Sequence, residues 1–165
     1  MKRCTMSIAL VAALLSVTVA QASEFSGAYV GGKIGYNNNT PTSSATYNKG
    51  FFGGEVGYGW NVGKAMLGLD GFADDHAQSA TGRDDGVDVK LGYPMGKWMP
   101  YAKLGVTGTK PGTRPNGAVG VEYKFEPEWS VVGELFTDSY SVNGVDQTNA
   151  NATVGVNYYF NSSRK

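Results

Sequence analysis

The feature that most constrains the fold is an alternation of apolar with small or polar residues that recurs eight times. The alternating segments are residues 27–36, 51–60, 65–73, 87–93, 100–106, 117–125, 129–136 and 151–160. A period of two is typical of β-strands that present one apolar face. Within these segments the apolar face carries no charge, and the opposite face carries Lys33, Glu55, Asp70, Asp88, Lys90, Lys103, Glu122, Lys124 and Glu134. Because a shift by one residue would turn all nine onto the apolar face, the pattern predicts eight strands and assigns their faces.

The segments between these strands alternate in length. Residues 61–64, 94–98 and 126–128 are short connections, whereas 37–50, 74–86, 107–116 and 137–150 are long and polar. If consecutive strands run up and down, all short turns lie at one end and all long loops at the other. This layout is typical of an all-β, eight-stranded antiparallel transmembrane barrel with short periplasmic turns and longer extracellular loops. Because lipid cannot satisfy an open sheet edge, we expect the last strand, 151–160, to pair with the first.

The alternation alone does not say which face meets lipid. A soluble periplasmic ligand-binding barrel would show the same pattern with the apolar face inside, and it is one alternative. Bulky aromatic residues gather at the short-turn end of the apolar face: Tyr58, Trp60, Tyr93, Tyr123, Phe125, Trp129, Tyr158 and Phe160. Such a ring is typical of the aromatic girdle at a membrane interface. Many of the 24 glycines fall on the charged face, which suits the narrow interior of eight strands.

The first 22 residues have the features of a secretory signal peptide. Lys2 and Arg3 precede an apolar stretch from Ile8 to Val19, and small residues occupy positions 20 and 22. The apolar stretch is shorter than the ~20 residues that a spanning helix requires. We therefore expect residues 1–22 to be cleaved and residues 23–165 to form one outer-membrane barrel domain.

The composition of this mature segment argues against several kinds of chemistry. The only cysteine, Cys4, lies in the predicted signal peptide, and removing Lys2 and Arg3 leaves 12 basic against 14 acidic residues. Neither a thiolate site nor an electrostatic attraction to nucleic acid is expected. The only histidine, His76, lies in a polar loop near Ser79, and no dinucleotide-binding, P-loop or EF-hand pattern occurs. We expect no catalytic residue, cofactor or metal.

The segments "SGAYVGGKIGYN" and "ATVGVNYYF" resemble the first and last strands of the small eight-stranded outer-membrane barrels of Gram-negative bacteria, the opacity-type and OmpX-like proteins and the membrane domain of OmpA. The resemblance implies that the barrel-assembly machinery reads the last strand. The matching positions are Val154, Val156, Tyr158 and Phe160. The sequence "NSSRK" departs from the pattern, because the family usually stops at the terminal aromatic residue.

The nine interior charges have two interpretations. Four lysines and five carboxylates could pair to fill the lumen, or they could line a narrow ion pathway; a barrel of eight strands favours the filled lumen. The resemblance implies a non-enzymatic, monomeric wall element that contacts outer-membrane lipid and lipopolysaccharide and displays its loops to a surface partner, for adhesion or envelope stability. The alternatives are a narrow small-solute or ion porin and an enzyme that modifies lipid A with His76.

Overall fold

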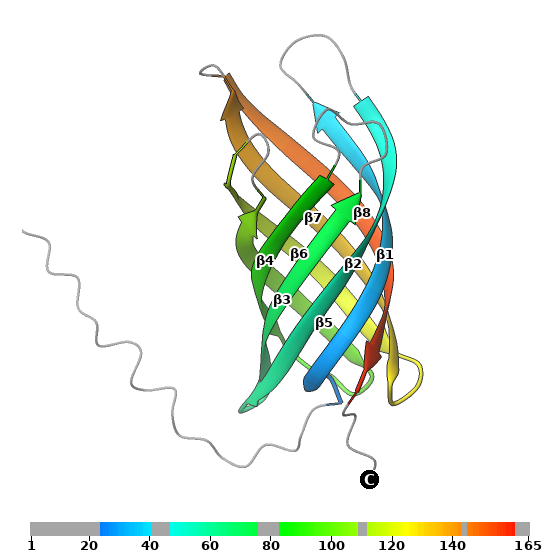
Figure 1. Cartoon of the computed structure of the whole chain (residues 1–165). Coiled ribbons are helices and arrows are strands. Elements are labelled where there is room, and N and C mark those ends of the chain that lie inside the picture. The colour runs from blue at the N-terminus through cyan, green and yellow to red at the C-terminus, as the bar shows by residue number, and fades with distance from the viewer. Residues whose placement is uncertain (1–23, 41–46, 76–82, 109–111, 143–144, 161–165) are drawn as a thin grey trace, which may run out of the picture.

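The chain forms a closed barrel of eight antiparallel strands (Figure 1). The computed structural model describes residues 24–40, 47–75, 83–108, 112–142 and 145–160. The strands are β1 (Gly27–Thr40), β2 (Tyr47–Val62), β3 (Ala65–Asp75), β4 (Arg83–Gly92), β5 (Trp98–Thr107), β6 (Arg114–Lys124), β7 (Trp129–Val142) and β8 (Val145–Tyr159). Each pairs with its neighbours in the chain, and β1 pairs with β8 from Tyr29↔Tyr159 to Thr40↔Thr148. The predicted strand number, strand order and closure are confirmed. No helix in the described ranges is long and apolar enough to cross a membrane.

Three short turns lie at one end of the barrel, as the sequence predicts. They are residues 63–64, 93–97 and 125–128. Gly63 has φ 63° and Gly96 has φ 61°, in the left-handed region where a side chain is strained. Glycine at these two positions lets the turns 63–64 and 93–97 stay tight.

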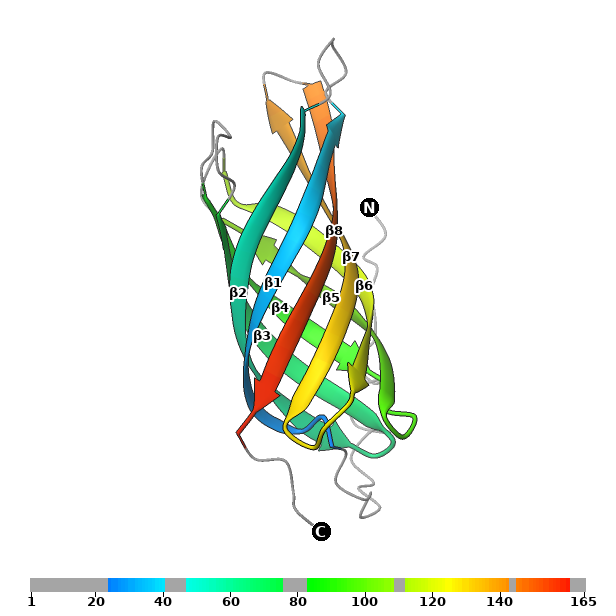
Figure 2. The same cartoon turned by 90° about the vertical axis from the view of Figure 1, so that its right-hand side faces the viewer.

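The strands run further at the opposite end than the sequence pattern indicates. The predicted long loop 137–150 is wrong, because β7 and β8 continue as a hairpin and leave only residues 143–144 between them. The predicted loop 37–50 likewise loses both its ends to β1 and β2. These stretches are rich in Asn, Ser, Thr and Asp, so no regular apolar alternation marks them in the sequence, yet backbone hydrogen bonding extends the ladders. The strands β1, β2, β7 and β8 have 14 to 16 residues and β3 to β6 have 10 or 11, so one side of the barrel stands taller (Figure 2).

The outer wall is apolar and the interior holds the charges. Outward residues such as Ile34 and Leu104 are 68% and 72% exposed, whereas Lys90 and Glu122 on the inner face are fully buried. A barrel in water would have the opposite arrangement, because contiguous exposed apolar surface of this extent is unfavourable there. The soluble-barrel alternative is therefore wrong, and the exposed apolar wall is the surface that meets lipid.

Candidate functional site

The lumen is the first candidate site, because every charge predicted for the inner face lies there. Eight of the nine residues are buried, and Lys33 is nearly so, with its side chain 11% exposed. The structure adds four inner-face charges that the sequence analysis assigned to loops: Asp74, Asp84, Arg114 and Asp138. The described inner wall therefore carries five cationic and eight anionic side chains.

Lys103 on β5 forms the central cluster of the lumen. Its Nζ lies 3.2 Å from Glu55, 3.0 Å from Asp70 and 3.1 Å from Glu134. The Tyr101 hydroxyl donates to Glu134 Oε2 at 2.9 Å, and the Tyr29 hydroxyl donates to Asp70. A single ammonium thus joins carboxylates from β2, β3 and β7 across the interior, where pairing offsets the cost of burying charge.

Glu122 on β6 is the centre of a second cluster, nearer the short-turn end. Its Oε2 accepts from Lys90 Nζ at 2.9 Å, and its Oε1 accepts from Ser130 at 2.5 Å and Tyr159 at 2.7 Å. A weaker bond from Asn157 Nδ2 measures 3.4 Å. Lys90 also lies 4.3 Å from the centroid of the Tyr101 ring, a cation–π contact that links the two clusters.

Apolar side chains close the short-turn end of the lumen. Phe25, which precedes β1, packs with Tyr29, Met66, Met99 and Tyr159, and all five are buried. The rings of Phe25 and Tyr159 meet edge to face at a centroid distance of 6.5 Å. This floor separates the charged clusters from the aqueous phase at that end. Lys124 Nζ caps it, 3.7 Å from the centroid of the Tyr159 ring.

Arg114 holds the opposite, long-loop end of the lumen together. Its Nη2 donates to Asp84 Oδ1 and its Nε donates to Asp138 Oδ2, each at 2.8 Å. Between this group and the Lys103 cluster, the rings of Phe72 and Phe136 meet edge to face, with their centroids 5.9 Å apart. Arg114 was predicted to lie in a loop because Pro115 follows it, and proline argues against a strand interior. The signal was its parity: position 114 has the same inward parity along β6 as Glu122 and Lys124.

Glycines on the inner face let neighbouring side chains lie flat across the adjacent strand. A Cβ at Gly105 would overlap Asp88 Oδ1, one at Gly53 would overlap Asp74 Oδ1, and one at Gly31 would overlap Asn157 Oδ1. The interior is thus filled by long side chains that occupy the space above a glycine on the next strand. This packing explains why glycine and charge share one face in the sequence.

The predicted aromatic ring lies on the outer face at the short-turn end. Its members are exposed or half-exposed, and they pack in neighbouring pairs. The ring centroids of Tyr58 and Trp60 lie 4.8 Å apart, and those of Trp129 and Tyr158 lie 5.0 Å apart. Trp98 belongs to the same ring, 4.4 Å from Tyr123, and was missed because β5 begins two residues earlier than predicted. The proposed assembly residues Val154, Val156, Tyr158 and Phe160 all follow the outward face of β8 and its end.

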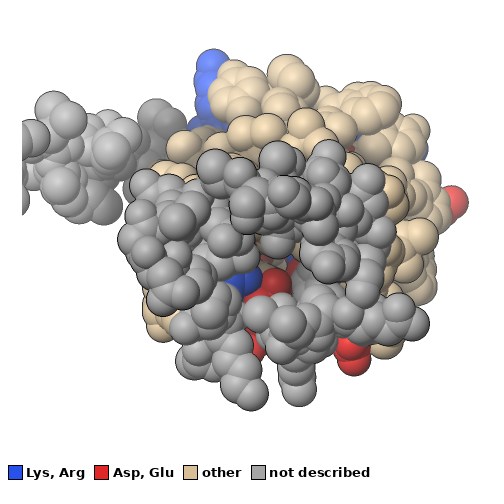
Figure 3. Space-filling view, turned by 90° about the horizontal axis from the view of Figure 1, so that it is seen from above, with Lys and Arg blue, Asp and Glu red and all other residues tan. Residues whose placement is uncertain are grey.

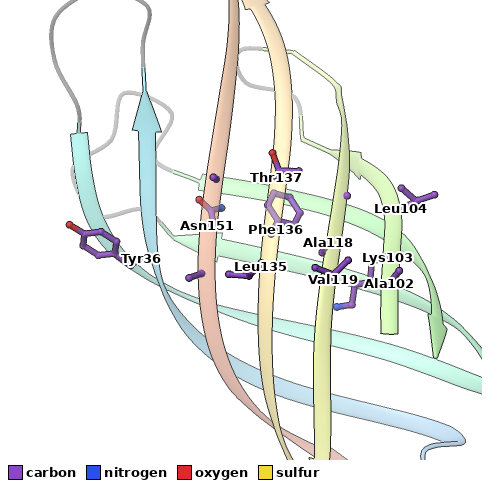
Figure 4. A pocket seen from close by; sticks show the side chains of 13 residues that line it. Tyr36, Ala102, Lys103, Leu104, Ala118, Val119, Leu135, Phe136, Thr137 and Asn151 are labelled. Atoms are coloured by element: carbon purple, nitrogen blue, oxygen red, sulfur yellow. The ribbon is translucent and has the colours of Figure 1, made fainter. Parts of the chain in front are cut away.

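A groove on the outer wall is the second candidate site (Figure 4). It has a volume of about 760 Å³ and runs over β5 to β8 and β1. Its outward lining is aliphatic and aromatic, with small residues along the floor: Tyr36, Ala102, Leu104, Gly117, Val119, Leu135, Thr137, Ala150 and Ala152. Such a lining suits a hydrocarbon chain of the surrounding lipid.

The enzymatic alternative depends on two residues of a predicted loop. His76 and Ser79 lie outside the described residues, as do the predicted signal peptide and the "NSSRK" extension. Within the described ranges, no group of three or more His, Cys, Asp or Glu side chains is arranged to hold a metal ion.

An apolar outer wall, an interfacial aromatic ring and a charged, closed interior together define a transmembrane β-barrel. The sequence matches the family described as outer membrane protein beta-barrel domain over residues 7–160, and the chain belongs to this family. The family is characteristic of the bacterial outer membrane, which places this barrel there and its short turns on the periplasmic side.

Solved structures share the fold at low sequence identity. Neisserial surface protein A is 14% identical with a TM-score of 0.56, over 82% of this chain and 98% of that one. Ail, the attachment invasion locus protein of Yersinia pestis, is 10% identical with a TM-score of 0.59, over 81% and 98% of the two chains. A de novo designed transmembrane β-barrel is 17% identical with a TM-score of 0.50, over 83% and 98%. Among curated proteins no sequence matches significantly.

Proposed function

We propose that this protein is a non-enzymatic wall element of the outer membrane that displays its tall rim to a partner outside the cell. The observation that carries the proposal is the closed lumen beneath an extended rim. A barrel whose lumen is filled by side chains offers its surfaces for function. Ail is named for attachment and invasion and Neisserial surface protein A for its surface location, and both names support the same class of role.

The contents of the lumen favour a wall element over a porin. The apolar floor, the Glu122 cluster, the Lys103 cluster and the phenylalanine pair succeed one another along the axis, and their side chains are almost entirely buried. Eight strands enclose an interior that side chains just fill, whereas aqueous channels require wider barrels.

The outward surfaces supply the contacts that the proposal needs. The paired ends of β7 and β8, from Ser139↔Thr148 to Val142↔Val145, extend the backbone ladder beyond the apolar band. The groove at Figure 4 supports contact with an acyl chain of lipopolysaccharide or another outer-leaflet lipid. We further propose that residues 1–22 are removed on export, that the barrel-assembly machinery reads the outward side chains of β8, and that the barrel acts as a monomer.

The test compares cells that produce the wild-type barrel, cells that lack it, and cells whose β7–β8 hairpin is shortened by replacing residues 139–148 with an Asn-Gly turn. Attachment to host cells and to abiotic surfaces is measured, together with detergent sensitivity and the amount of barrel in the outer membrane. We expect the shortened variant to reach the membrane normally and to attach less. A matched control replaces the two turn residues 63–64, at the opposite end, with Asn-Gly.

This experiment distinguishes the two forms of the proposal, a role in attachment and a role in envelope stability. Loss of attachment with unchanged detergent sensitivity supports a surface partner, whereas detergent sensitivity confined to the cells that lack the barrel supports envelope stability. If none of these cells differs from the wild type, the proposed role is wrong. An altered lipid A profile in overproducing cells, abolished by His76→Ala, would instead favour the enzymatic alternative.

A further inference from the structure

The groove on the outer wall follows two neighbouring rows of outward residues, one with large and one with small side chains (Figure 4). Val119 and Leu135 pair across β6 and β7 and form a ridge on the short-turn side. Leu135 is 63% exposed, so this ridge stands out from the wall. One step nearer the long loops, Gly117 pairs with Thr137, and Thr137 pairs with Ala150. The small row forms the floor of the groove, and the ridge forms its lower wall.

The groove is long enough to hold one hydrocarbon chain. Leu104, which pairs with Gly117, borders it on β5. Tyr36, which pairs with Ala152, borders it on β1. From β5 to β1 there are four strand spacings of about 4.8 Å, or about 19 Å along the wall. One leaflet holds about 15 Å of hydrocarbon, half of a core of ~30 Å, so an acyl chain fits between Leu104 and Tyr36.

The outer wall suits hydrocarbon and the interior does not. Viewed from the long-loop end, acidic and basic atoms are visible in the hollow between the loops (Figure 3). By contrast, the outward side chains that line the groove all belong to the described residues, and none of them is charged. The groove is also continuous with the exposed apolar wall that meets lipid. Its occupant is therefore a component of the membrane.

The groove lies in the leaflet at the long-loop end of the barrel. The next outward pair above its floor is Ser139↔Thr148, and both residues are polar and exposed. Tyr36, at the β1 end of the groove, is about half exposed, and tyrosine is enriched where hydrocarbon meets headgroups. Because the short turns face the periplasm, this leaflet is the outer one. Its lipid is lipopolysaccharide.

A second outer groove, of about 650 Å³, differs in charge. It crosses β1 to β5, and its outward lining includes Val56, Gly71 and Val87. Asp85 borders it near the long-loop end of β4, with its side chain exposed on the outer face. Lipopolysaccharide carries phosphate groups above its acyl chains, and a carboxylate at that level repels them. The groove of Figure 4 is therefore the better site for an anionic lipid than this acidic groove.

We propose that the groove of Figure 4 holds one acyl chain of lipopolysaccharide as a resident lipid, an inference that rests on the proposed function and deepens its lipid contact. The groove follows the curve of the wall across five strands, and a flexible hydrocarbon chain can follow the same curve. A second copy of the barrel cannot, because two convex walls meet only along a narrow strip. The bound chain gains dispersion contacts with the ridge and with Leu104.

The experiment measures which lipids stay bound to the barrel in detergent. Barrel refolded from inclusion bodies, and so free of lipopolysaccharide, is mixed with purified lipid A or with phosphatidylethanolamine. Native mass spectrometry then counts the lipids retained on each barrel as the collision energy rises. We expect one lipid A per barrel, retained at energies at which phosphatidylethanolamine has dissociated. Gel mobility with and without boiling verifies that each sample is folded.

Leucine substitutions in the two grooves form a matched pair. Gly117→Leu fills the floor of the groove, and its Cβ has room because the nearest atom, Leu104 Cδ2, lies 3.5 Å away. Gly71→Leu adds the same side chain to the acidic groove, where the Cβ lies 3.9 Å from the Gly86 carbonyl oxygen. Gly117→Leu should lower the retention of lipid A to that of phosphatidylethanolamine, whereas Gly71→Leu should retain it as the wild type does. Ala150→Leu fills the same floor from β8 and should act like Gly117→Leu.

Four results would overturn the proposal. The first is lipid A that Gly117→Leu and Ala150→Leu retain as strongly as the wild type does. The second is an equal loss of lipid A in Gly71→Leu, and the third is phosphatidylethanolamine retained as strongly as lipid A. The fourth is a lipid-free pair of barrels that Gly117→Leu separates, which would make a second copy the occupant. Attachment by cells with the shortened β7–β8 hairpin is a separate measurement, so the proposed surface role and this lipid site can fail independently.

Discussion

Replacing Lys103 with methionine should destabilise the barrel more than any other single lysine substitution. The ammonium lies 3.0 to 3.2 Å from three buried carboxylates, and methionine keeps most of the side-chain volume while removing the charge. Glu55, Asp70 and Glu134 would then face one another without a cation. The expected destabilisation is electrostatic, because the substitution leaves the backbone register around β5 unchanged.

The magnitude follows from these distances. At an effective dielectric constant of about 20, each contact corresponds to about 5 kcal/mol of attraction before desolvation. Desolvation and the mutual repulsion of the three carboxylates offset most of this sum. Removing one partner of a buried pair costs about 3 to 5 kcal/mol, and Lys103 should lie at the upper end of that range because it has three partners.

The assay is urea unfolding of the barrel in lipid vesicles, with the folded fraction measured by gel mobility without boiling. The control is Lys64→Met, because Lys64 is exposed in the turn between β2 and β3 and should be nearly neutral. Adding Glu134→Gln to Lys103→Met should restore about 1 to 2 kcal/mol, since one uncompensated charge is removed.

A free energy of unfolding for Lys103→Met within about 0.5 kcal/mol of the wild type would refute this reasoning. The same conclusion would follow if Glu134→Gln destabilised the double variant further. Either result would mean that the carboxylates are not held together by the Lys103 charge.

Four other outcomes are expected. Val89→Arg places a charge on the lipid-facing wall and should cost about 2 to 4 kcal/mol in the same urea assay; no loss would mean that this face does not meet lipid. Gly63→Ala should cost about 1 to 2 kcal/mol because φ is 63°, and an unchanged midpoint would contradict the turn geometry. Ser130→Ala removes a 2.5 Å hydrogen bond to the Glu122 carboxylate and should lower the free energy of unfolding by about 1.5 to 3 kcal/mol. No change would mean that the other donors to that oxygen are sufficient to satisfy it. In planar bilayers the wild type should give no stepwise conductance, and steps that change with Glu122→Gln would establish the porin alternative.

The strands and their faces were predictable because a strand in lipid must present apolar residues to the membrane at every second position. Outside the membrane a strand needs no apolar face, so the ends of β1, β2, β7 and β8 carry no alternation and were assigned to loops. Their strand structure depends on backbone pairing with neighbours, which one sequence does not reveal. The β6 residue Arg114 is a different case, because its inward position follows from its parity with Glu122 and Lys124 once the strand is extended past Pro115.

The occupants of the lumen were predictable and their partners were not. Parity alone placed Lys103 and Glu122 on one face, but the pairs join strands that are not adjacent, such as β5 with β2. Such contacts depend on the stagger of the closed barrel, which no local pattern encodes. The tyrosines 29, 101 and 159 also have inward parity, and their hydroxyl groups complete the clusters.

The glycines of the inner face have a consequence for how this interior can change over time. Where a long side chain occupies the space above a glycine on the next strand, the two positions form one unit of volume and cannot vary independently. Asp88 can be exchanged for another short polar residue while Gly105 remains, but a side chain at Gly105 requires both Asp88 and the Val87 carbonyl to move. The interior can therefore acquire new side-chain chemistry by single substitutions at the long residues. A substitution at one of its glycines would instead displace the neighbouring side chain and is not tolerated as a first step.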